Sequence, residues 1–164
     1  MTRIARGYTL IEILVALTIL SVVFAVGFAG FRDYSRRQEL ETLTRQLRGD
    51  LAKAREDALA GIKSTSASCN GANTLLGQGF SVGSNLGIYF YRFFYHCSSA
   101  TVLNRTVNVP SGYSINWSPN VYFYFKSVGQ GTSMTAGTST TITITQTSTG
   151  AAGSVTVDST GNIQ

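Results

Sequence analysis

Two cysteines and the chain's single histidine are the first candidates for chemistry. His96 lies next to Cys97, and the other cysteine is Cys69. One histidine and two thiols fall short of the four ligands of a zinc site, and a cysteine held in a disulfide cannot act as a nucleophile. Residues 58–164 also hold one acidic side chain, Asp158, which makes hydrolytic chemistry hard to build. We therefore expect no catalytic residue, no metal and no cofactor.

The carboxylate of Glu12 is the next candidate, because it lies at the start of a long apolar segment. Residues 13–31 are nineteen residues whose only polar side chains are Thr18 and Ser21. A helix of that length spans about the ~30 Å hydrocarbon core of a bilayer, and both hydroxyls can hydrogen-bond to their own helix. An unpaired carboxylate costs on the order of 2.5–3.5 kcal/mol at the bilayer centre and less near the interface. Glu12 therefore either lies at the headgroups or has a function.

The residues around Glu12 form a recognisable motif. The segment Gly-Tyr-Thr-Leu-Ile-Glu at positions 7–12 follows a short basic leader, residues 1–7, and opens the apolar run. It resembles the processing signal of type IV pilins and of type II secretion pseudopilins, with Tyr8 in place of the usual phenylalanine. The resemblance implies that a prepilin peptidase cuts between Gly7 and Tyr8 and methylates the new N-terminus.

Cleavage at this position gives Glu12 a specific task. It would create an α-ammonium at Tyr8, four residues before the carboxylate, and two charges in apolar surroundings are tolerated only when they are paired. In a helical stack of staggered subunits, the acid of one chain can meet the amine of its neighbour. We therefore expect Glu12 to act in assembly, with other pilin or pseudopilin subunits, the prepilin peptidase and the bacterial inner membrane as partners.

Two other interpretations of the apolar run remain. A removable secretory signal has a shorter apolar core, and the best cleavage candidate here is Ala25-Val-Gly27. The run could also be a plain membrane anchor. The counts of Lys and Arg on its two sides do not fix its orientation. The resemblance and the cysteines place the C-terminal part in the periplasm, with a single pass through the membrane.

Residues 32–62 are charged but keep a helical period. With Thr9 as its start and Gly61 as its stop signal, a continuous helix would be roughly 78 Å long. Part of this region, residues 47–58, looks like the second signature of GspH/FimT-type minor pseudopilins. The tripeptide Arg48-Gly49-Asp50 matches an adhesion motif, but it falls inside the expected helix. Apolar side chains recur at three- and four-residue steps and predict one buried stripe: Leu40, Leu43, Leu47, Leu51, Ala54 and Ala58.

Residues 63–164 are rich in Ser, Thr, Gly, Asn and aromatic residues and indicate an antiparallel β-sheet head. The alternation of Thr and Ile at 141–145 is typical of a half-buried strand. The aromatic segments 89–95 and 122–125 are core strands or, alternatively, a base-stacking platform. We expect strands at 80–82, 86–95, 102–109, 113–117, 121–125, 141–146 and 154–158, with turns that include 83–85.

The cysteines lie in this head. The periplasm allows disulfides to persist, and a Cys69–Cys97 bridge would close a loop of 27 intervening residues, worth roughly 3–4 kcal/mol on the chain-entropy account. The alternative is two free buried thiols.

The charge distribution gives little support for nucleic-acid binding. The net charge is +5, but ten of the thirteen Lys and Arg lie in residues 1–63. The tail, residues 154–164, resembles the end of the GspH/FimT-type head, yet it lacks the arginines of the members that bind DNA. We therefore expect no nucleic acid and no small-molecule substrate as partner.

The sequence as a whole predicts an α+β protein with a pilin fold. Its parts are a leader (1–7), a membrane and polymerisation half of the helix (8–31), an amphipathic half (32–62) and a β-rich head (63–164). The predicted function is that of a non-enzymatic minor pilin or pseudopilin of a type IV pilus or type II secretion system. A major pilin, and a membrane-tethered binding module that never polymerises, remain as alternatives.

Overall fold

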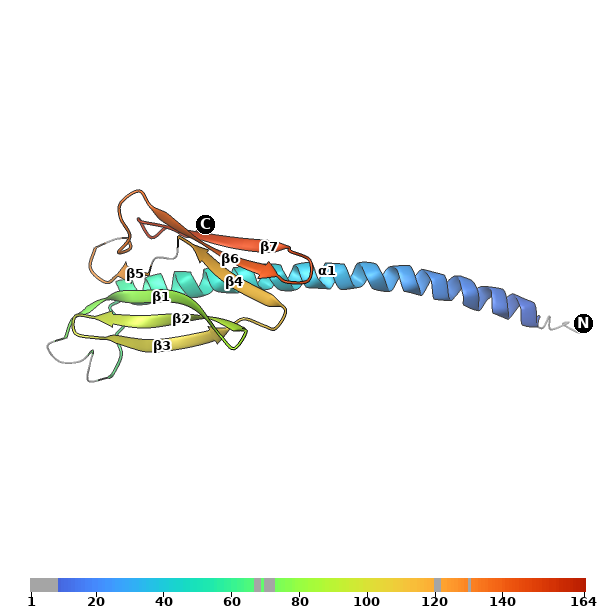
Figure 1. Cartoon of the computed structure of the whole chain (residues 1–164), viewed down its shortest axis with the longest axis horizontal. Helices are drawn as coiled ribbons and strands as arrows, with labels where there is room; N and C mark the ends of the chain where they lie inside the picture. Colours follow the sequence, from blue (N-terminus) through green and yellow to red (C-terminus); the bar gives the residue numbers. More distant parts are fainter. Residues whose placement is uncertain (1–8, 67–68, 70–72, 120–121, 130) are drawn as a thin grey trace, which may run out of the picture. The chain divides into compact units, whose positions relative to one another are not determined.

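The computed structural model describes residues 9–66, 69, 73–119, 122–129 and 131–164. The chain divides between Glu39 and Leu40 into two compact units, each described by itself below. Helix α1 precedes all the strands in these ranges (Figure 1), which confirms the α+β class. The elements are α1 (Leu10–Leu59), β1 (Leu75–Asn85), β2 (Ile88–Cys97), β3 (Thr101–Asn108), β4 (Tyr113–Ser118), β5 (Phe123–Lys126), β6 (Ser139–Gln146) and β7 (Ala152–Asp158).

The first unit contains the apolar part of α1. Its large apolar side chains from residue 10 to residue 31 are between 49% and 82% exposed. The two hydroxyls in this stretch are satisfied within the helix, because Thr18 donates to the Val15 carbonyl and Ser21 to the Thr18 carbonyl, each at 2.8 Å. This part of the helix therefore presents an almost purely apolar surface.

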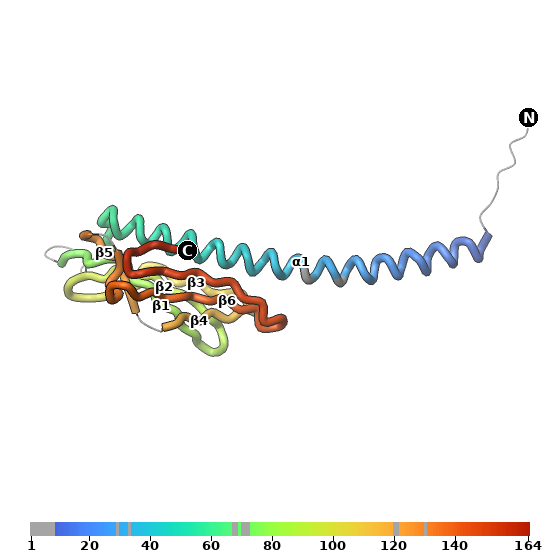
Figure 2. The backbone as a smooth tube through the Cα atoms, turned by 90° about the horizontal axis from the view of Figure 1, so that it is seen from above, coloured from blue at the N-terminus to red at the C-terminus, as the bar shows by residue number. Residues whose placement is uncertain are grey.

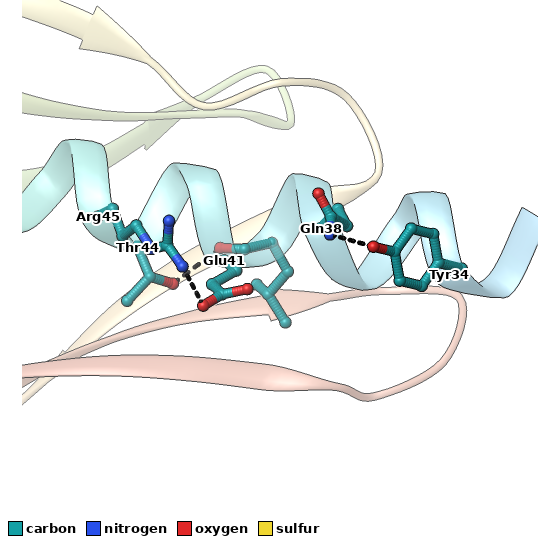
Figure 3. Close-up of polar contacts among 6 residues, drawn as sticks. Tyr34, Gln38, Glu41, Thr44 and Arg45 are labelled. Carbon is teal, nitrogen blue, oxygen red and sulfur yellow. Dashed lines mark hydrogen bonds and ion pairs between the residues drawn. The ribbon is translucent and has the colours of Figure 1, made fainter.

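Polar pairs one turn apart follow the apolar stretch (Figure 3). In the first unit, Gln38 Nε2 donates to the Tyr34 hydroxyl at 2.6 Å. In the second unit, Arg45 forms an exposed ion pair with Glu41 at 2.5 Å. Such pairs stabilise a helix by about 0.2–0.5 kcal/mol each, so they support the helix only weakly.

In the second unit, one stripe of α1 is buried against the sheets. Leu47, Leu51 and Ala58 are fully buried, Leu40 and Ala54 nearly so, and Leu43 packs against this core. The predicted stripe is therefore confirmed. Figures 1 and 2 both show the cyan part of α1 running beside the strands.

The helix ends at the expected glycine. Gly61 has a φ of +67°, a conformation that glycine adopts without steric cost. The Ile62 N–H donates to the Asp57 carbonyl at 2.9 Å, and the Gly61 N–H to the Ala58 carbonyl at 3.0 Å. These two bonds form a Schellman motif, which satisfies carbonyls that the helix end leaves free.

The strands form two antiparallel sheets, with orders β3-β2-β1-β5 and β4-β6-β7. Phe80 of β1 is fully buried and lies at the centre of the aromatic core. Its ring centroid is 5.5 Å from that of Phe93 and 5.8 Å from that of Phe123, both on neighbouring strands of its own sheet. It is also 5.9 Å from the ring of Trp117, which belongs to β4 in the second sheet. Phe80 therefore joins the two sheets.

The second sheet follows the predicted alternation. Ile142 and Ile144 of β6 are buried, while Thr141, Thr143 and Thr145 are partly exposed on the other face. The isoleucines lie opposite Trp117 and Ile115 of β4 in the register. Side chains of the central strand β6 and of the edge strand β4 therefore both belong to the core.

The expected turn at residues 83–85 is wrong, because these residues belong to β1. The hairpin instead turns at Leu86 and Gly87, which have φ values of +49° and +80°. Two positive φ values in a two-residue loop are typical of the tight turns that match the twist of antiparallel strands. Leu86, expected to start a strand, is therefore in the turn and is 96% exposed.

The chain closes after β7 with a turn built on its last carboxylate. Asp158 Oδ1 accepts hydrogen bonds from the backbone N–H groups of Thr160 and Asn162, each at 2.9 Å, and from the Thr160 hydroxyl at 2.6 Å. These donors favour the charged form and lower the pKa of Asp158. The tail then returns to β7, where Ile163 bridges to Val157.

Replacing Leu51 by alanine should destabilise the second unit. The side chain is fully buried, and deleting buried methyl groups leaves a cavity, so we expect the free energy of unfolding to fall by about 2–5 kcal/mol. Denaturant titration of the full chain in detergent micelles measures this change. Leu59→Ala is the matched control, since Leu59 is on the same helix but 50% exposed. Equal losses in the two variants would contradict the packing of the stripe.

Candidate processing and assembly site

The first turn of α1 holds Glu12 and is capped by Thr9. The Thr9 hydroxyl oxygen accepts from the Glu12 N–H at 3.3 Å, and the Thr9 carbonyl accepts from the Glu12 and Ile13 N–H groups at 3.1 and 3.3 Å. This is the geometry of an N-cap, and Thr-x-x-Glu is the sequence of a capping box. A carboxylate in the first turn is also favoured by the helix dipole. Gly7 and Tyr8, the predicted processing residues, lie outside the described residues.

The surface beside Glu12 is apolar. The carboxylate adjoins a shallow depression along the helix, lined by Ile13, Ala16, Leu17 and Leu20. By length and composition, α1 is a helix that could cross a membrane, and no residue of its most apolar stretch is buried within the described chain. Once another apolar surface covers this stretch, the Glu12 carboxylate has few polar groups of its own helix nearby.

A disulfide joins Cys69 to Cys97, with their Cα atoms 5.6 Å apart. Both residues are buried. Cys97 is the last residue of β2, so the bridge ties the segment after α1 to the end of a central strand. The alternative of two free thiols is thereby excluded.

The histidine next to this disulfide has aromatic and hydroxyl neighbours. His96 stacks on Tyr124 with a centroid distance of 4.5 Å, and its Nδ1 lies 3.2 Å from the Thr101 hydroxyl. In the part of the chain that the structure describes, no group of three or more His, Cys, Asp or Glu side chains could hold a metal ion. The sulfur of Cys97 is engaged in the disulfide. The contacts of His96 are therefore ring stacking on Tyr124 and a hydrogen bond with the Thr101 hydroxyl.

A polar cluster joins α1 to the first sheet within the second unit. Asp50, on the helix, accepts from the Tyr91 hydroxyl at 2.7 Å and pairs with Arg105 at 2.7 Å. Burial and the hydrogen bond to the Asp50 carboxylate raise the pKa of Tyr91 above its ordinary value. Asp50 is the acid of the Arg-Gly-Asp tripeptide. Because this carboxylate is bound within its own chain, the tripeptide is not available as an adhesion site.

Residues 2–28 match the family model of the prokaryotic N-terminal methylation motif. The match supports a protein of the type IV pilin or pseudopilin kind, and together with the apolar helix it is consistent with anchoring in the inner membrane. No curated protein and no solved structure gives a significant match to the chain.

Sequence reasoning missed two features of these sites. One is the capping role of Thr9, although a threonine three residues before a glutamate is a signal for it. The other is the pairing of Asp50 with Tyr91 and Arg105, which the residues next to Asp50 in the sequence do not indicate. It depends on how the helix is rotated against the sheet.

Replacing Tyr91 by phenylalanine removes one donor from a mostly buried carboxylate. We expect the free energy of unfolding at pH 7 to fall by about 1.5–3 kcal/mol, the range for hydrogen bonds to charged groups. The pKa of Tyr91 is raised above the ordinary 10.0, so the unfolded state ionises first as the pH rises. The stabilisation is complete below about pH 10 and is lost at higher pH.

Denaturant titrations between pH 7 and pH 11 measure this dependence. The gap in stability between the unmodified chain and Tyr91→Phe should narrow above pH 10. Tyr124→Phe is the control and should change the free energy of unfolding by less than about 0.5 kcal/mol. A gap that stayed constant up to pH 11 would contradict the assigned hydrogen bond.

Proposed function

We propose that this chain is a minor pilin or pseudopilin, a structural subunit that is cut by a prepilin peptidase and assembled into a type IV pilus or a type II secretion pseudopilus. One observation carries the proposal. Glu12 lies within the methylation motif at residues 2–28 and in the first turn of a helix whose apolar side chains are exposed. The minor role and the GspH/FimT type rest on the resemblance of residues 47–58 and 154–164.

Processing between Gly7 and Tyr8 leaves Thr9 as the second residue of the mature chain. Because Thr9 caps α1, the new α-ammonium lies close to the first turn of the helix. The positive end of a helix dipole disfavours a cation there. A carboxylate from a neighbouring subunit offsets this penalty when it reaches the amine. Pairing of the cleaved terminus with Glu12 of another chain is therefore favourable.

Assembly follows from the apolar surface around that acid. The bilayer covers residues 13–31 of the stored subunit, and neighbouring helices cover them in a filament. In either case Glu12 is flanked by apolar side chains such as Ile13 and Leu17. An unpaired charge in such surroundings is costly, so the favoured arrangement pairs Glu12 with the amine of the next chain. The pair then sets the stagger between subunits.

The head occupies the periplasm in this proposal. The disulfide between Cys69 and Cys97 supports that side of the membrane, because such bonds persist in oxidising compartments and are rare in the cytoplasm. The head then remains on the outer side while the helix moves from the bilayer into the filament.

Glu12→Ala should insert into the membrane and fail to enter filaments. Removing one member of a buried charge pair costs about 3–5 kcal/mol, so we expect the mutant's share of sheared filaments to fall at least about a hundredfold. The measurement is an immunoblot of membrane and sheared-filament fractions from cells that carry the assembly machine.

Glu41→Ala is the matched control, because it removes the same charge from the same helix at an exposed ion pair. It should enter filaments normally, since such pairs contribute little. Normal incorporation of Glu12→Ala would sink the pairing mechanism. Absence of the unmodified chain from every filament fraction would favour the tethered binding module instead.

A further inference from the structure

The sheet β3-β2-β1-β5 has a second face, opposite the core. Strand neighbours alternate between faces, so Phe90, Arg92, Phe94 and His96 lie on the side away from buried Tyr91 and Phe93. Tyr124 of β5 is on this side too, because Gly79 of β1 pairs with both Phe94 and Tyr124 in the register. All of these side chains are at least partly exposed. We call this surface the aromatic face; its members are Phe90, Arg92, Phe94, His96, Tyr122, Tyr124 and Lys126.

Glycines of β1 let the rings lie low on this face. A Cβ at Gly83 would be 2.8 Å from the Phe90 ring, whereas one at Gly77 would first meet the backbone carbonyl of Phe125. A Cβ at Gly79 would meet the hydroxyl of Tyr122. Rings that occupy the space of missing side chains lie over the strand rather than standing away from it. The aromatic face is therefore flat along β1.

Planar groups on this face also lie against one another. His96 stacks on Tyr124 and is 5.9 Å from the ring of Tyr122. The Arg92 guanidinium carbon lies 4.0 Å from the centroid of Phe90. Tyr122 is 41% exposed. These contacts hold the planar groups in place, so a ligand that stacks on them loses little side-chain entropy.

The charge of the aromatic face has one sign. It carries Arg92 and Lys126, and the single carboxylate after residue 57, Asp158, ends β7 in the other sheet. Arg92 forms no salt bridge with any described residue. A face of exposed rings with cations and without carboxylates complements a ring-bearing anion.

The geometry points to an acidic polysaccharide as the ligand of the aromatic face. The apolar C–H face of a sugar ring packs on a flat aromatic surface, and a uronic carboxylate then reaches the guanidinium of Arg92 or the ammonium of Lys126. A single-stranded nucleic acid fits less well, because proteins hold it in a positively charged groove that follows its backbone, whereas the aromatic face carries two cations, Arg92 and Lys126. The inference does not rest on processing or filament assembly.

The test uses the full chain in detergent micelles and alginate, a polymer of uronic acids, as the probe. Titration calorimetry in low salt should show binding to alginate at least about tenfold tighter than to dextran, a neutral polymer, or to oligo(dT). Tyr122→Leu and Arg92→Gln should each weaken alginate binding by about tenfold, because each removes a stacking or charged contact of about 1.4 kcal/mol. Tyr34→Leu, at an exposed tyrosine of the first unit, should leave it unchanged.

The outcomes separate ligand binding from a purely structural role. Each variant must keep the melting temperature and the disulfide of the unmodified chain, and the mildest variant, Arg92→Gln, decides the matter if Tyr122→Leu does not fold. Absence of alginate binding, or binding that both variants leave intact, would overturn the inference. Tighter binding of oligo(dT) than of alginate would also overturn it and identify a nucleic-acid platform.

Discussion

The exposed apolar surface of residues 10–31 is the constraint on which the role of the helix start depends. Burying a leucine, isoleucine, valine or phenylalanine side chain of this surface away from water is favourable by about 1.5–3 kcal/mol of free energy. Within the described chain the large apolar side chains here stay 49–82% exposed, which is consistent with a bilayer or other chains covering them. The single polar side chain at the start of this surface, Glu12, is then the group that any such partner must accommodate. In the proposed function, cleavage within the methylation motif creates the amine with which Glu12 pairs.

In the second unit the same helix is stabilised by contacts with its own chain. From Leu40 onward, α1 is held by a buried stripe, by the cluster around Asp50 and by two sheets that meet at Phe80. These interactions lie within one unit and are independent of membrane or filament. A helix with one part stabilised by its own chain and another by its surroundings suits a subunit that exchanges lipid for protein neighbours.

Much of this was predictable because the signals are local. The apolar run, the leucine spacing from Leu40 to Leu51 and the stop at Gly61 follow from helix periodicity and from the conformational freedom of glycine. The threonine and isoleucine alternation of β6 follows from the pleat of a strand. The α+β class and the pilin-type helix start are therefore readable from the chain.

The features that the sequence does not predict are those that depend on contacts between residues far apart in the chain. The strand expected at 80–82 is longer in the structure, since β1 also takes in Gly77, Gly79 and Gly83. At these positions a ring or a backbone carbonyl from a neighbouring segment occupies the space of a side chain. The aromatic segments are neither wholly core nor wholly platform, since alternation sends Tyr91 inward and Phe90 outward. The binding of Asp50 likewise depends on helix rotation. For Glu12 the motif gives the position, whereas its pairing with the amine of another subunit stays a prediction.

The mass of the N-terminal peptide tests the central claim most directly. It should be measured by mass spectrometry of digests from the membrane and sheared-filament fractions of cells that express the native chain. We predict a peptide that begins with N-methylated Tyr8 in both fractions. A peptide that begins at Met1, or one cut near Gly27, would contradict it and leave a tethered or secreted β-rich domain.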